Sequence, residues 1–313
     1  MRLFKTQVIV NPASDQGRTG GRWTQIKEAL KTFLKEYTYE FTEKPRHAIE
    51  ISRAAIKKGN ELILGVGGDG TINEIANGFF ENQSLINPEV NLGILPSGTG
   101  SDFIRSFNIP QSYRGAMEVI THPRTSKIDV GKISFTNHDH QPEERYFLNI
   151  TDFGIGGEVA EHMDLTKQEK KAASYLKSLV TTFMRYKFKK LNITVDGEEI
   201  PDKEFMIGAV ANGRVFGRGM RVAPKAILDD GLFDFILVKK LTKLEFIRNL
   251  LKLYKGTHLD HPKVSFLRGR TIEASPIDDD ERVLLEVDGE QVGMLPARFE
   301  ILPRCLTIKG ALS

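Results

Sequence analysis

A glycine-rich loop constrains the fold of this 313-residue chain more than any other feature. Its sequence is Gly65-Val66-Gly67-Gly68-Asp69-Gly70-Thr71, and it separates an apolar run typical of a buried strand from apolar residues at helical spacing. Backbone amides in such a loop, with the N-terminus of the following helix, suit a phosphate group. A carboxylate beside a polyphosphate needs a cation between them, so Asp69 predicts a magnesium–nucleotide site. The alternative is an ordinary turn in which Asp69 or Thr71 caps the helix.

Two common nucleotide-binding folds are disfavoured by the residues around this loop. The loop satisfies the spacing Gly-x-Gly-x-x-Gly, but a dinucleotide site also needs an acidic residue about 20 positions further on, at the end of the next strand. The next predicted strand, 91–95, is followed by Pro96 and Ser97 and has no acid there. The sequence contains no Gly-x-x-x-x-Gly-Lys-Ser/Thr loop, which excludes the usual P-loop ATPases.

The chain changes character near residue 128. Before it, runs typical of strands alternate with helical periodicity, which predicts a parallel sheet covered by helices. After it, short strand-like runs are joined by turns rich in Gly, Asp and Pro, with helices predicted near 170–186 and 244–254. We predict a Rossmann-like α/β nucleotide-binding domain over residues 1–127, followed by an antiparallel β-sandwich domain over 128–313. We leave open whether the last residues of the chain return to the first domain.

Composition excludes several classes of protein. Hydrophobic residues make up 40% and charged residues 27% of the chain, so it is not largely disordered, collagen-like or coiled-coil. The net charge of +3 is too small for a histone-like or ribosomal protein, and we expect no nucleic acid partner. The sequence shows neither a signal peptide nor an apolar run of about 18 residues, and its single cysteine, Cys305, cannot form an internal disulfide. We therefore expect a cytoplasmic protein.

Residues 167–190 form a basic segment of net charge +7 that also has apolar residues at helical spacing. A basic amphipathic helix suits an anionic membrane surface, where each base adds about 1 kcal/mol. The alternative is a helix of the domain core with a solvated basic back. The bases are Lys167, Lys170, Lys171, Lys177, Arg185, Lys187, Lys189 and Lys190, with Glu169 as the one acid.

Two more loops follow predicted strands of the first domain, at 11–21 and 96–103. Ligands bind at the carboxyl ends of strands in open α/β sheets, so we expect the three loops to converge. With these loops the chain resembles the catalytic domain of diacylglycerol and related lipid kinases, in their soluble bacterial branch. The resemblance covers nearly the whole chain and is carried by Asn11-Pro12-x-Ser14, Gly67-Gly68-Asp69-Gly70-Thr71 with Asn73-Glu74, Leu95-Pro96-x-Gly98-Thr99-x-x-Asp102-Phe103, Val222-Ala223-Pro224, Asp229–Asp234 and Val287-Asp288-Gly289-Glu290. Two departures are Asp15 and Ser101, where the family usually has glycine and asparagine.

The resemblance implies that ATP binds the first domain and that a lipid acceptor enters from the second. It places Asp69 and Asp102 around magnesium and its water network. It also implies a structural magnesium held by the Asp230 carboxylate and the backbone oxygens of Ile227 and Leu232. The nucleotide contacts it implies are Asn11, Thr42, Gly67, Gly68, Asp69, Gly70, Thr71, Ile72, Asn73 and Thr99.

Glu290 matches the family position assigned as general base, but the chain contains a second copy of the same four residues. Val195-Asp196-Gly197-Glu198 repeats the pattern of 287–290. Asp-Gly flanked by β-branched residues predicts a hairpin turn, and spacing alone makes Glu198 and Glu290 equal candidates. Only the resemblance favours Glu290.

Taken together, these features predict an ATP- and Mg²⁺-dependent lipid kinase that phosphorylates a hydroxyl of diacylglycerol or a related lipid. Such a reaction needs positioning and charge neutralisation, and a carboxylate to take the proton of a weakly nucleophilic hydroxyl. We expect contact with a lipid at the inner membrane surface and leave a homodimer open. One alternative is an NAD kinase, which shares the Gly-Gly-Asp-Gly-Thr loop but lacks the Asn11-Pro12-x-Ser14 and Asp229-Asp230-Gly231 motifs. Another is a non-catalytic nucleotide-binding membrane sensor, which would have no use for a general base.

Overall fold

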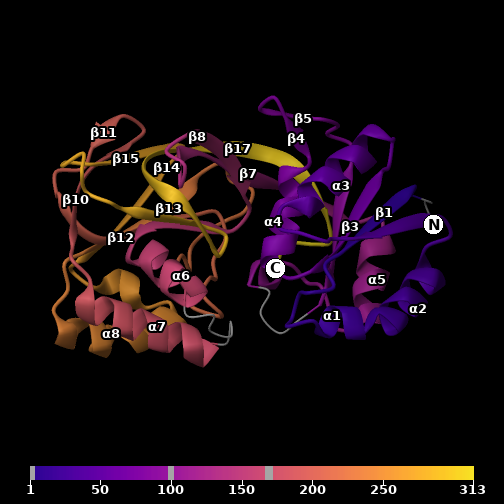
Figure 1. Cartoon of the computed structure of the whole chain (residues 1–313), viewed down its shortest axis with the longest axis horizontal. Helices are drawn as coiled ribbons and strands as arrows, with labels where there is room; N and C mark the ends of the chain where they lie inside the picture. The colour runs from indigo at the N-terminus through magenta and orange to yellow at the C-terminus, as the bar shows by residue number, and fades with distance from the viewer. Residues whose placement is uncertain (1–3, 98–101, 166–171) are drawn as a thin grey trace. The chain divides into compact units, whose positions relative to one another are not determined.

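The structure is a computed structural model that describes residues 4–97, 102–165 and 172–313, and it divides into two compact units (Figure 1). The first unit contains Met1–Asp129 and Arg304–Ser313, and the second contains Val130–Pro303. Strands β7 (Thr125–Asn137) and β17 (Glu290–Lys309) each contribute residues to both units. The domain limits predicted from the sequence stay a prediction.

The first unit is built on a parallel sheet. Its strand order is β2 (Tyr37–Phe41), β1 (Thr6–Val10), β3 (Leu62–Gly67), β6 (Asn91–Pro96) and the end of β17. Every residue of β1 and β3 is buried, which explains why β3 and the Val8-Ile9-Val10 part of β1 are continuous apolar runs rather than alternating ones. The α/β architecture predicted for this part of the chain is confirmed.

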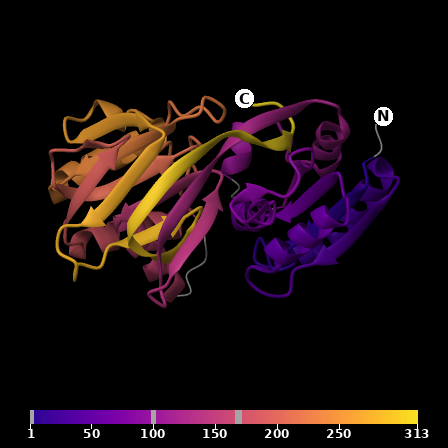
Figure 2. The same cartoon turned by 90° about the horizontal axis from the view of Figure 1, so that it is seen from above.

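Helices cover both faces of this sheet, as Figure 2 shows. Helices α3 and α4 pack together, and α2 packs on α5. A separate hairpin joins β4 (Phe80–Glu81) to β5 (Ser84–Leu85). The helices are α1 (Arg18–Gly21), α2 (Trp23–Phe33), α3 (His47–Lys57), α4 (Asp69–Asn77), the short 3₁₀ turn Phe103–Ser106, and α5 (Tyr113–Thr121).

The second unit is an antiparallel β-sandwich with helices on one outer face. One run of paired strands joins β8 (Pro142–Phe147), β7, β17, β15 (Thr271–Pro276), β10 (Lys189–Val195) and β11 (Glu198–Glu199). A second run joins β16 (Leu284–Val287), β9 (Ile150–Gly154), β12 (Glu204–Ala211), β13 (Phe233–Lys239) and β14 (Val264–Gly269). The predicted sandwich is therefore confirmed.

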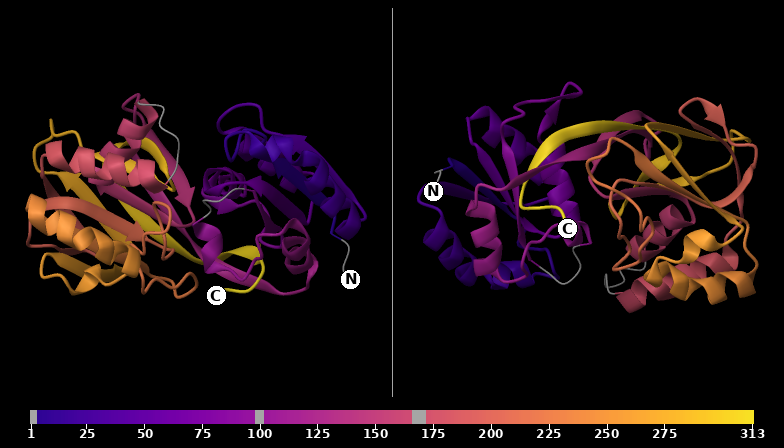
Figure 3. Two further views of the ribbon diagram at one scale, coloured as in Figure 1. Left: turned by 90° about the horizontal axis from the view of Figure 1, so that it is seen from below. Right: turned by 180° about the vertical axis from the view of Figure 1, so that it is seen from behind.

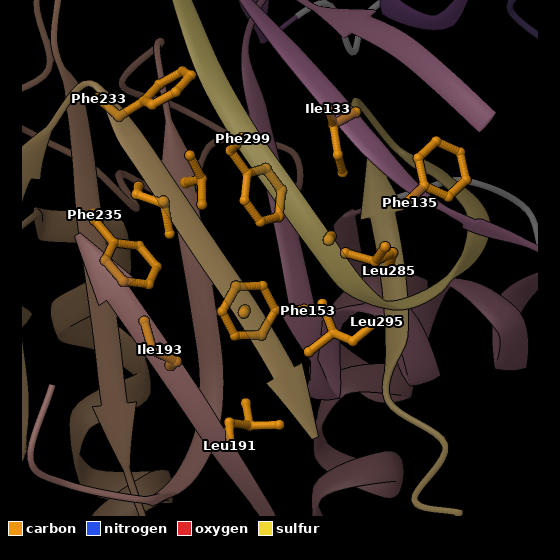
Figure 4. Close-up of a cluster of buried hydrophobic side chains, with 14 of the residues drawn as sticks. Ile133, Phe135, Phe153, Leu191, Ile193, Phe233, Phe235, Leu285, Leu295 and Phe299 are labelled. Atoms are coloured by element: carbon orange, nitrogen blue, oxygen red, sulfur yellow. The ribbon is translucent and has the colours of Figure 1, made fainter. Parts of the chain in front are cut away.

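The strand β13 shows how two cores share one strand. Phe233, Phe235 and Leu237 point into the core between the two runs of strands, where Figure 4 shows Phe235 beside Phe153 and Phe299. Ile236 and Val238 point the other way, into a second core under the helices. Both faces of β13 are thus buried, as the apolar run from Phe235 to Val238 requires.

The helical layer of the second unit consists of α6 (Ile155–Leu165), α7 (Ala172–Arg185) and α8 (Lys243–Lys255), seen together in Figure 3. A short 3₁₀ turn, His258–Asp260, follows α8. The sequence analysis did not predict α6, because its Gly156-Gly157 pair weakens the helical pattern. These glycines are required: a Cβ on Gly156 would lie 2.0 Å from an Asp152 oxygen, and one on Gly157 would lie 2.7 Å from Leu284. Within the described residues no helix has the length and apolar character needed to span a membrane.

Candidate active site

The order of strands in the first unit identifies where a ligand would bind. The chain leaves β1 to form β2 on one side and then returns to form β3 on the other. In open α/β sheets such a switch point opens a crevice at the carboxyl ends of the two strands. The loops that begin at Asn11 and Gly68 border this crevice.

These two loops are linked by a side-chain hydrogen bond. Asn11 Nδ2 donates to Thr71 Oγ1 at 2.9 Å, and Asn11 Oδ1 accepts the Ala13 amide at 3.0 Å. Gly67 leaves room for the Thr71 side chain that accepts this bond, because a Cβ there would lie 2.7 Å from it. The structure therefore brings together residues that are 60 positions apart in the chain.

Asp69 and Asp102 also lie together. The Asp69 carboxylate accepts the Asp102 amide at 2.7 Å, and the buried Asp102 carboxylate lies 3.3 Å from Nε of Arg105. Helix α4 begins at Asp69 with Gly68 as its N-cap, and no side chain caps it. The N-cap position is thus a glycine with no side chain to cap the helix, and the first turn of α4 lies where its amides suit an anion.

The remaining candidates of this unit lie around the same strand ends. Thr42 follows β2, and its amide donates to the Val10 carbonyl at 2.9 Å. Ile72 is buried in the core rather than in the crevice, and Asn73 holds the Asn77 side chain through its own carbonyl at 2.9 Å. Gly70 lies in the first turn of α4. Thr99 lies outside the described residues, as does Ser101.

A chain of hydroxyl groups joins the loops after β1 and β6. Ser14 Oγ and Thr19 Oγ1 are 2.6 Å apart, and Thr19 Oγ1 and Ser97 Oγ are also 2.6 Å apart. Thr19 and Ser97 are both buried. The sequence analysis did not single out Thr19, and only its contact with Ser97, 78 residues further on, reveals its role.

Two acidic residues near these loops have structural explanations. Asp15 has φ 52°, in the left-handed region where glycine is favoured and aspartate is tolerated, and it lies 3.7 Å from an Arg22 nitrogen. This accommodates aspartate where the family usually has glycine. Glu74 accepts the Arg46 amide at 2.9 Å and the Ala48 amide at 3.2 Å, so it caps the N-terminus of α3.

In the second unit, the predicted metal site lies at a turn before β13. Asp230 Oδ1 accepts the Leu232 amide at 3.1 Å, the intervening Gly231 has φ 75°, and Arg268 forms an ion pair with the other Asp230 oxygen. Arg268 also binds the buried Asp234 at 2.9 Å. Burial raises the pKa of Asp234, and the Arg268 guanidinium opposes this shift. Arg268 was not predicted from the sequence. Its ion pairs make Asp230 part of a cluster of charged side chains with Asp234.

The donors at this turn fit a hard divalent cation, because a carboxylate and backbone carbonyls are oxygen ligands. Ile227 is an exposed residue of the same loop. Across the described ranges of the chain, no three His, Cys, Asp or Glu side chains gather as a metal site. A cation here would therefore depend on the carbonyl oxygens of Ile227 and Leu232 together with Asp230.

The two Val-Asp-Gly-Glu segments form the same turn, as predicted. Asp196 and Gly197 have φ 50° and 87°, and Asp288 and Gly289 have φ 45° and 95°, so both hairpins are closed by paired left-handed residues. Glu198 and Glu290 are both exposed. Glu290 differs in lying 3.3 Å from Nη1 of Arg145.

The aspartates of these turns brace neighbouring segments. Asp288 is 8% exposed and accepts the amides of Leu148, Asn149 and Ile150 at 2.9 to 3.1 Å. Asp196 accepts the amides of Arg270 and Thr271, both at 2.8 Å, but it is exposed. In each segment the aspartate is structural, which leaves the glutamate for another role.

We expect Asp288→Ala to lower the free energy of unfolding by about 3 kcal/mol or more, because three buried amides lose their acceptor. Urea unfolding followed by circular dichroism measures this. Asp196→Ala is the matched control, and we expect it to cost about 1 kcal/mol because water replaces the lost acceptor. Equal losses in the two variants would contradict the assignment of Asp288 as the brace.

Comparison with known proteins decides which family has this arrangement. Residues 5–133 match the diacylglycerol kinase catalytic domain, and residues 149–310 match the YegS C-terminal NAD kinase beta sandwich-like domain. A diacylglycerol kinase of Staphylococcus aureus (strain JH9) is 32% identical over 316 residues, which cover 97% of this chain and 91% of the relative. One from Staphylococcus haemolyticus is 30% identical over 314 residues, covering 96% and 87%. The chain belongs to the diacylglycerol kinase family.

Solved structures agree with this at the level of the fold. A diacylglycerol kinase from Bacillus anthracis superposes with a TM-score of 0.72 at 21% identity, covering 99% of this chain and 98% of that one. An NAD kinase from Archaeoglobus fulgidus in complex with ATP gives a TM-score of 0.53 at 15% identity, covering 97% and 93%. This chain is thus a lipid kinase-like enzyme, and its family implies ATP as the phosphoryl donor.

The kinase has an unusual buried carboxyl pair in its second unit that the sequence analysis missed. Asp152 on β9 lies opposite Glu286 on β16, and both are at most 3% exposed. Burial raises the pKa of Asp152 to about 7, against the lowering effect of hydrogen bonds with Glu286 and with the Gly157 backbone. Asp152 therefore keeps its proton over much of the acidic range.

Asp152 lines a cavity of about 100 Å³ between the sheet and the helices of this unit. The cavity is otherwise mostly apolar, with Phe216 and Met220 contributed by the 212–220 loop. That loop is ordered by the buried Asn212, whose Nδ2 donates to the Leu148 carbonyl at 2.9 Å. The loop therefore borders this cavity.

We expect the buried pair to make stability fall as the pH rises. Asp152 keeps its proton in the folded state up to about pH 7 but loses it near the ordinary aspartate pKa of 3.8 when unfolded. Between these values the folded state binds one more proton, so unfolding free energy falls by about 1.4 kcal/mol per pH unit from this group. Unfolding measured from pH 4 to 7 for wild type and Asp152→Asn should differ by this slope. Exposed Asp139→Asn serves as control, and an unchanged slope in Asp152→Asn would mean that Asp152 is ionised when folded.

The basic segment predicted at 167–190 is partly described, as Lys167, Lys170 and Lys171 lie outside the described residues. On α7 the apolar residues Leu179 and Phe183 are buried in the core under the helices, and Phe183 stacks on Phe246 of α8 at 3.8 Å. Lys177, Arg185 and Lys187 lie on the solvent side. The apolar face of α7 is thus used inside the unit, as in the alternative of a core helix.

Proposed function

We propose that this protein is an ATP- and Mg²⁺-dependent lipid kinase that transfers the γ-phosphate to a hydroxyl of diacylglycerol or a related lipid. The observation that carries the proposal is the convergence at the switch point, where Asn11 contacts Thr71 and Asp69 contacts Asp102. The first-turn amides of α4 suit phosphate oxygens, and the two carboxylates suit the magnesium that accompanies them. A peripheral position at the inner membrane surface follows from the lipid substrate.

The proposed nucleotide contacts lie along the crevice at the carboxyl ends of the strands. Asn11 and Thr42 lie at its edge, and residues 67–73 supply the phosphate loop, with Thr99 on the third loop. Asp69 would bind the magnesium that accompanies the phosphates, and Asp102 would support Asp69 in this role. Phosphoryl transfer needs mainly such positioning and charge neutralisation. A second, structural cation is proposed at Asp230, with the carbonyl oxygens of Ile227 and Leu232 as further ligands.

Glu290 is proposed as the general base. It takes the proton of the lipid hydroxyl while the hydroxyl oxygen bonds to the γ-phosphorus and the bond to the β–γ bridging oxygen breaks. The products are the phosphorylated lipid and ADP. Its exposed carboxylate beside Arg145 supports this role, because the group remains reachable by a substrate.

The acceptor is proposed to enter from the second unit. Its apolar cavity next to Ile150, Ile155 and Leu250 offers the chemistry that hydrocarbon needs. Diacylglycerol, phosphatidylglycerol and sphingoid lipids all present a hydroxyl beside apolar chains. The acceptor must therefore be identified by experiment.

The decisive experiment offers γ-labelled ATP with a total lipid extract and NAD side by side. We expect label on a lipid, in a reaction that requires Mg²⁺ and stops when a chelator removes it. NAD kinase is the second candidate, because the fold also resembles that of an NAD kinase. Label on NAD alone would establish that candidate, and ATP binding without transfer to either acceptor would indicate a nucleotide sensor.

A further inference from the structure

Helix α8 exposes large apolar side chains on its outer face. Leu244, Ile247 and Leu251 are 60%, 50% and 70% exposed. Because they are spaced by three and four residues, they lie in one stripe along the helix. We call these three residues the apolar stripe. Single exposed apolar residues are ordinary, but a row of three on one helix is not.

The stripe is held firmly in place. Thr242 and Glu245 form a capping box at the start of α8, and Gly256 ends the helix with φ 72°. On the inner face, Phe246 is buried and stacks on Phe183 of α7 at 3.8 Å. Because this inner face anchors the helix to the core, the outer stripe is a fixed feature and not a frayed end.

Basic residues accompany the stripe. Lys243, Arg248, Lys252 and Lys255 are all exposed, and they outnumber the one acid of α8, Glu245. Glu245 is itself engaged, with Lys263 Nζ at 2.8 Å and the Thr242 amide at 2.7 Å. At helical spacing Arg248, Lys252 and Lys255 lie along one side of the stripe. Apolar side chains beside bases complement a surface that is both apolar and negatively charged.

We propose that α8 docks on an anionic membrane surface, with its apolar stripe among the lipid chains and its bases at the headgroups. An interfacial helix binds in this way, and each base near such a surface adds about 1 kcal/mol. Residues of the opposite face, among them Phe246, Leu250 and Leu253, line the apolar cavity of this unit. The purpose of this docking rests on the proposed function, because α8 would then lie between the membrane and the cavity offered to the acceptor.

Vesicle sedimentation tests the docking surface. Wild type should bind vesicles made of phosphatidylglycerol and phosphatidylcholine in equal parts and should not bind phosphatidylcholine alone. The variant Leu244→Ser/Ile247→Ser/Leu251→Ser and the variant Arg248→Glu/Lys252→Glu should each bind about tenfold or more weakly. Ile277→Ser, which removes an equally exposed apolar residue elsewhere in the unit, should bind as wild type does. Wild-type binding by both α8 variants would overturn the proposal.

A site-specific probe adds a measurement that does not depend on loss of binding. Burial raises the pKa of Cys305, the chain's single cysteine, to about 12, so a thiol-reactive dye labels an introduced cysteine selectively. An environment-sensitive dye on Leu251→Cys should shift to the blue with anionic vesicles. The same dye on Ile277→Cys should not. Equal shifts at both positions, or none at either while the protein binds vesicles, would contradict docking through α8.

Activity separates this proposal from the proposed function. The triple serine variant should keep wild-type turnover on a water-soluble, short-chain diacylglycerol and lose it on diacylglycerol in anionic vesicles. If wild type binds vesicles through α8 but phosphorylates no lipid, the function fails and the docking surface stands. If instead wild type is a dimer and the serine variant a monomer with unchanged vesicle binding, the stripe contacts a second copy and the membrane proposal is wrong.

Discussion

Asparagine in place of Asp69 is expected to lower kcat by about 10³-fold with little effect on folding. The charge is lost, so the magnesium–phosphate complex loses a partner that matters most in the transition state. Asparagine still offers an oxygen to the Asp102 amide, now 2.7 Å from the carboxylate. We therefore expect the free energy of unfolding to change by no more than about 1 kcal/mol. Initial rates at saturating ATP, with urea unfolding in parallel, measure both quantities.

Asp15→Asn is the matched control for this prediction. Asp15 lies on the neighbouring loop and pairs with Arg18 and Arg22, at 3.9 and 3.7 Å. Asparagine tolerates its left-handed backbone as well as aspartate does. We expect turnover within about twofold of wild type, because the arginine partners are half-exposed, lie 3.7 Å or more away and contribute little. Retained turnover in Asp69→Asn would remove Asp69 from the reaction.

Glutamine in place of Glu290 is expected to lower kcat by about 10²- to 10⁴-fold, the usual contribution of a general base. Glutamine keeps the size of the side chain and still accepts a hydrogen bond from Arg145, so folding and ATP affinity should change little. Single-turnover rates with a lipid acceptor measure the chemical step directly, and ATP titration measures affinity.

Glu198→Gln uses the second copy of the same turn as an internal control. Glu198 is an exposed residue of an equivalent hairpin, so we expect a change in stability below about 0.5 kcal/mol and normal turnover. A silent Glu198→Gln enzyme beside an active Glu290→Gln enzyme would reverse the assignment. If both variants kept full activity, the hydroxyl proton would leave by another route.

Much of the fold could be predicted from the sequence because its signals are local. The apolar runs at 8–10 in β1 and along β3 mark strands buried on both faces, and the Asp-Gly pairs at 196–197 and 288–289 mark two-residue turns. The glycines of 65–70 mark a loop that must approach other groups closely. Each of these signals depends on residues that are neighbours in the chain.

The roles of individual acids could not be predicted in this way. Glu74 belongs to a motif of the family, yet its partners are the Arg46 and Ala48 amides. Asp152 and Glu286 meet only because β9 pairs with β16, and that pairing raises an aspartate pKa to about 7. The pKa and the hydrogen-bond partners of a carboxylate depend on its surroundings, and these come from segments far away in the sequence.

The helices of the second unit illustrate the same division. The sequence predicted helices near 170–186 and 244–254, and the charge pattern indicated the first of them as the membrane candidate. The structure buries Leu179 and Phe183 of α7, whereas it leaves Leu244 and Leu251 of α8 exposed. The sequence by itself determined that each segment forms a helix with apolar residues at regular spacing. Only the tertiary structure decided which apolar residues face the core, because that depends on the sheet against which each helix packs.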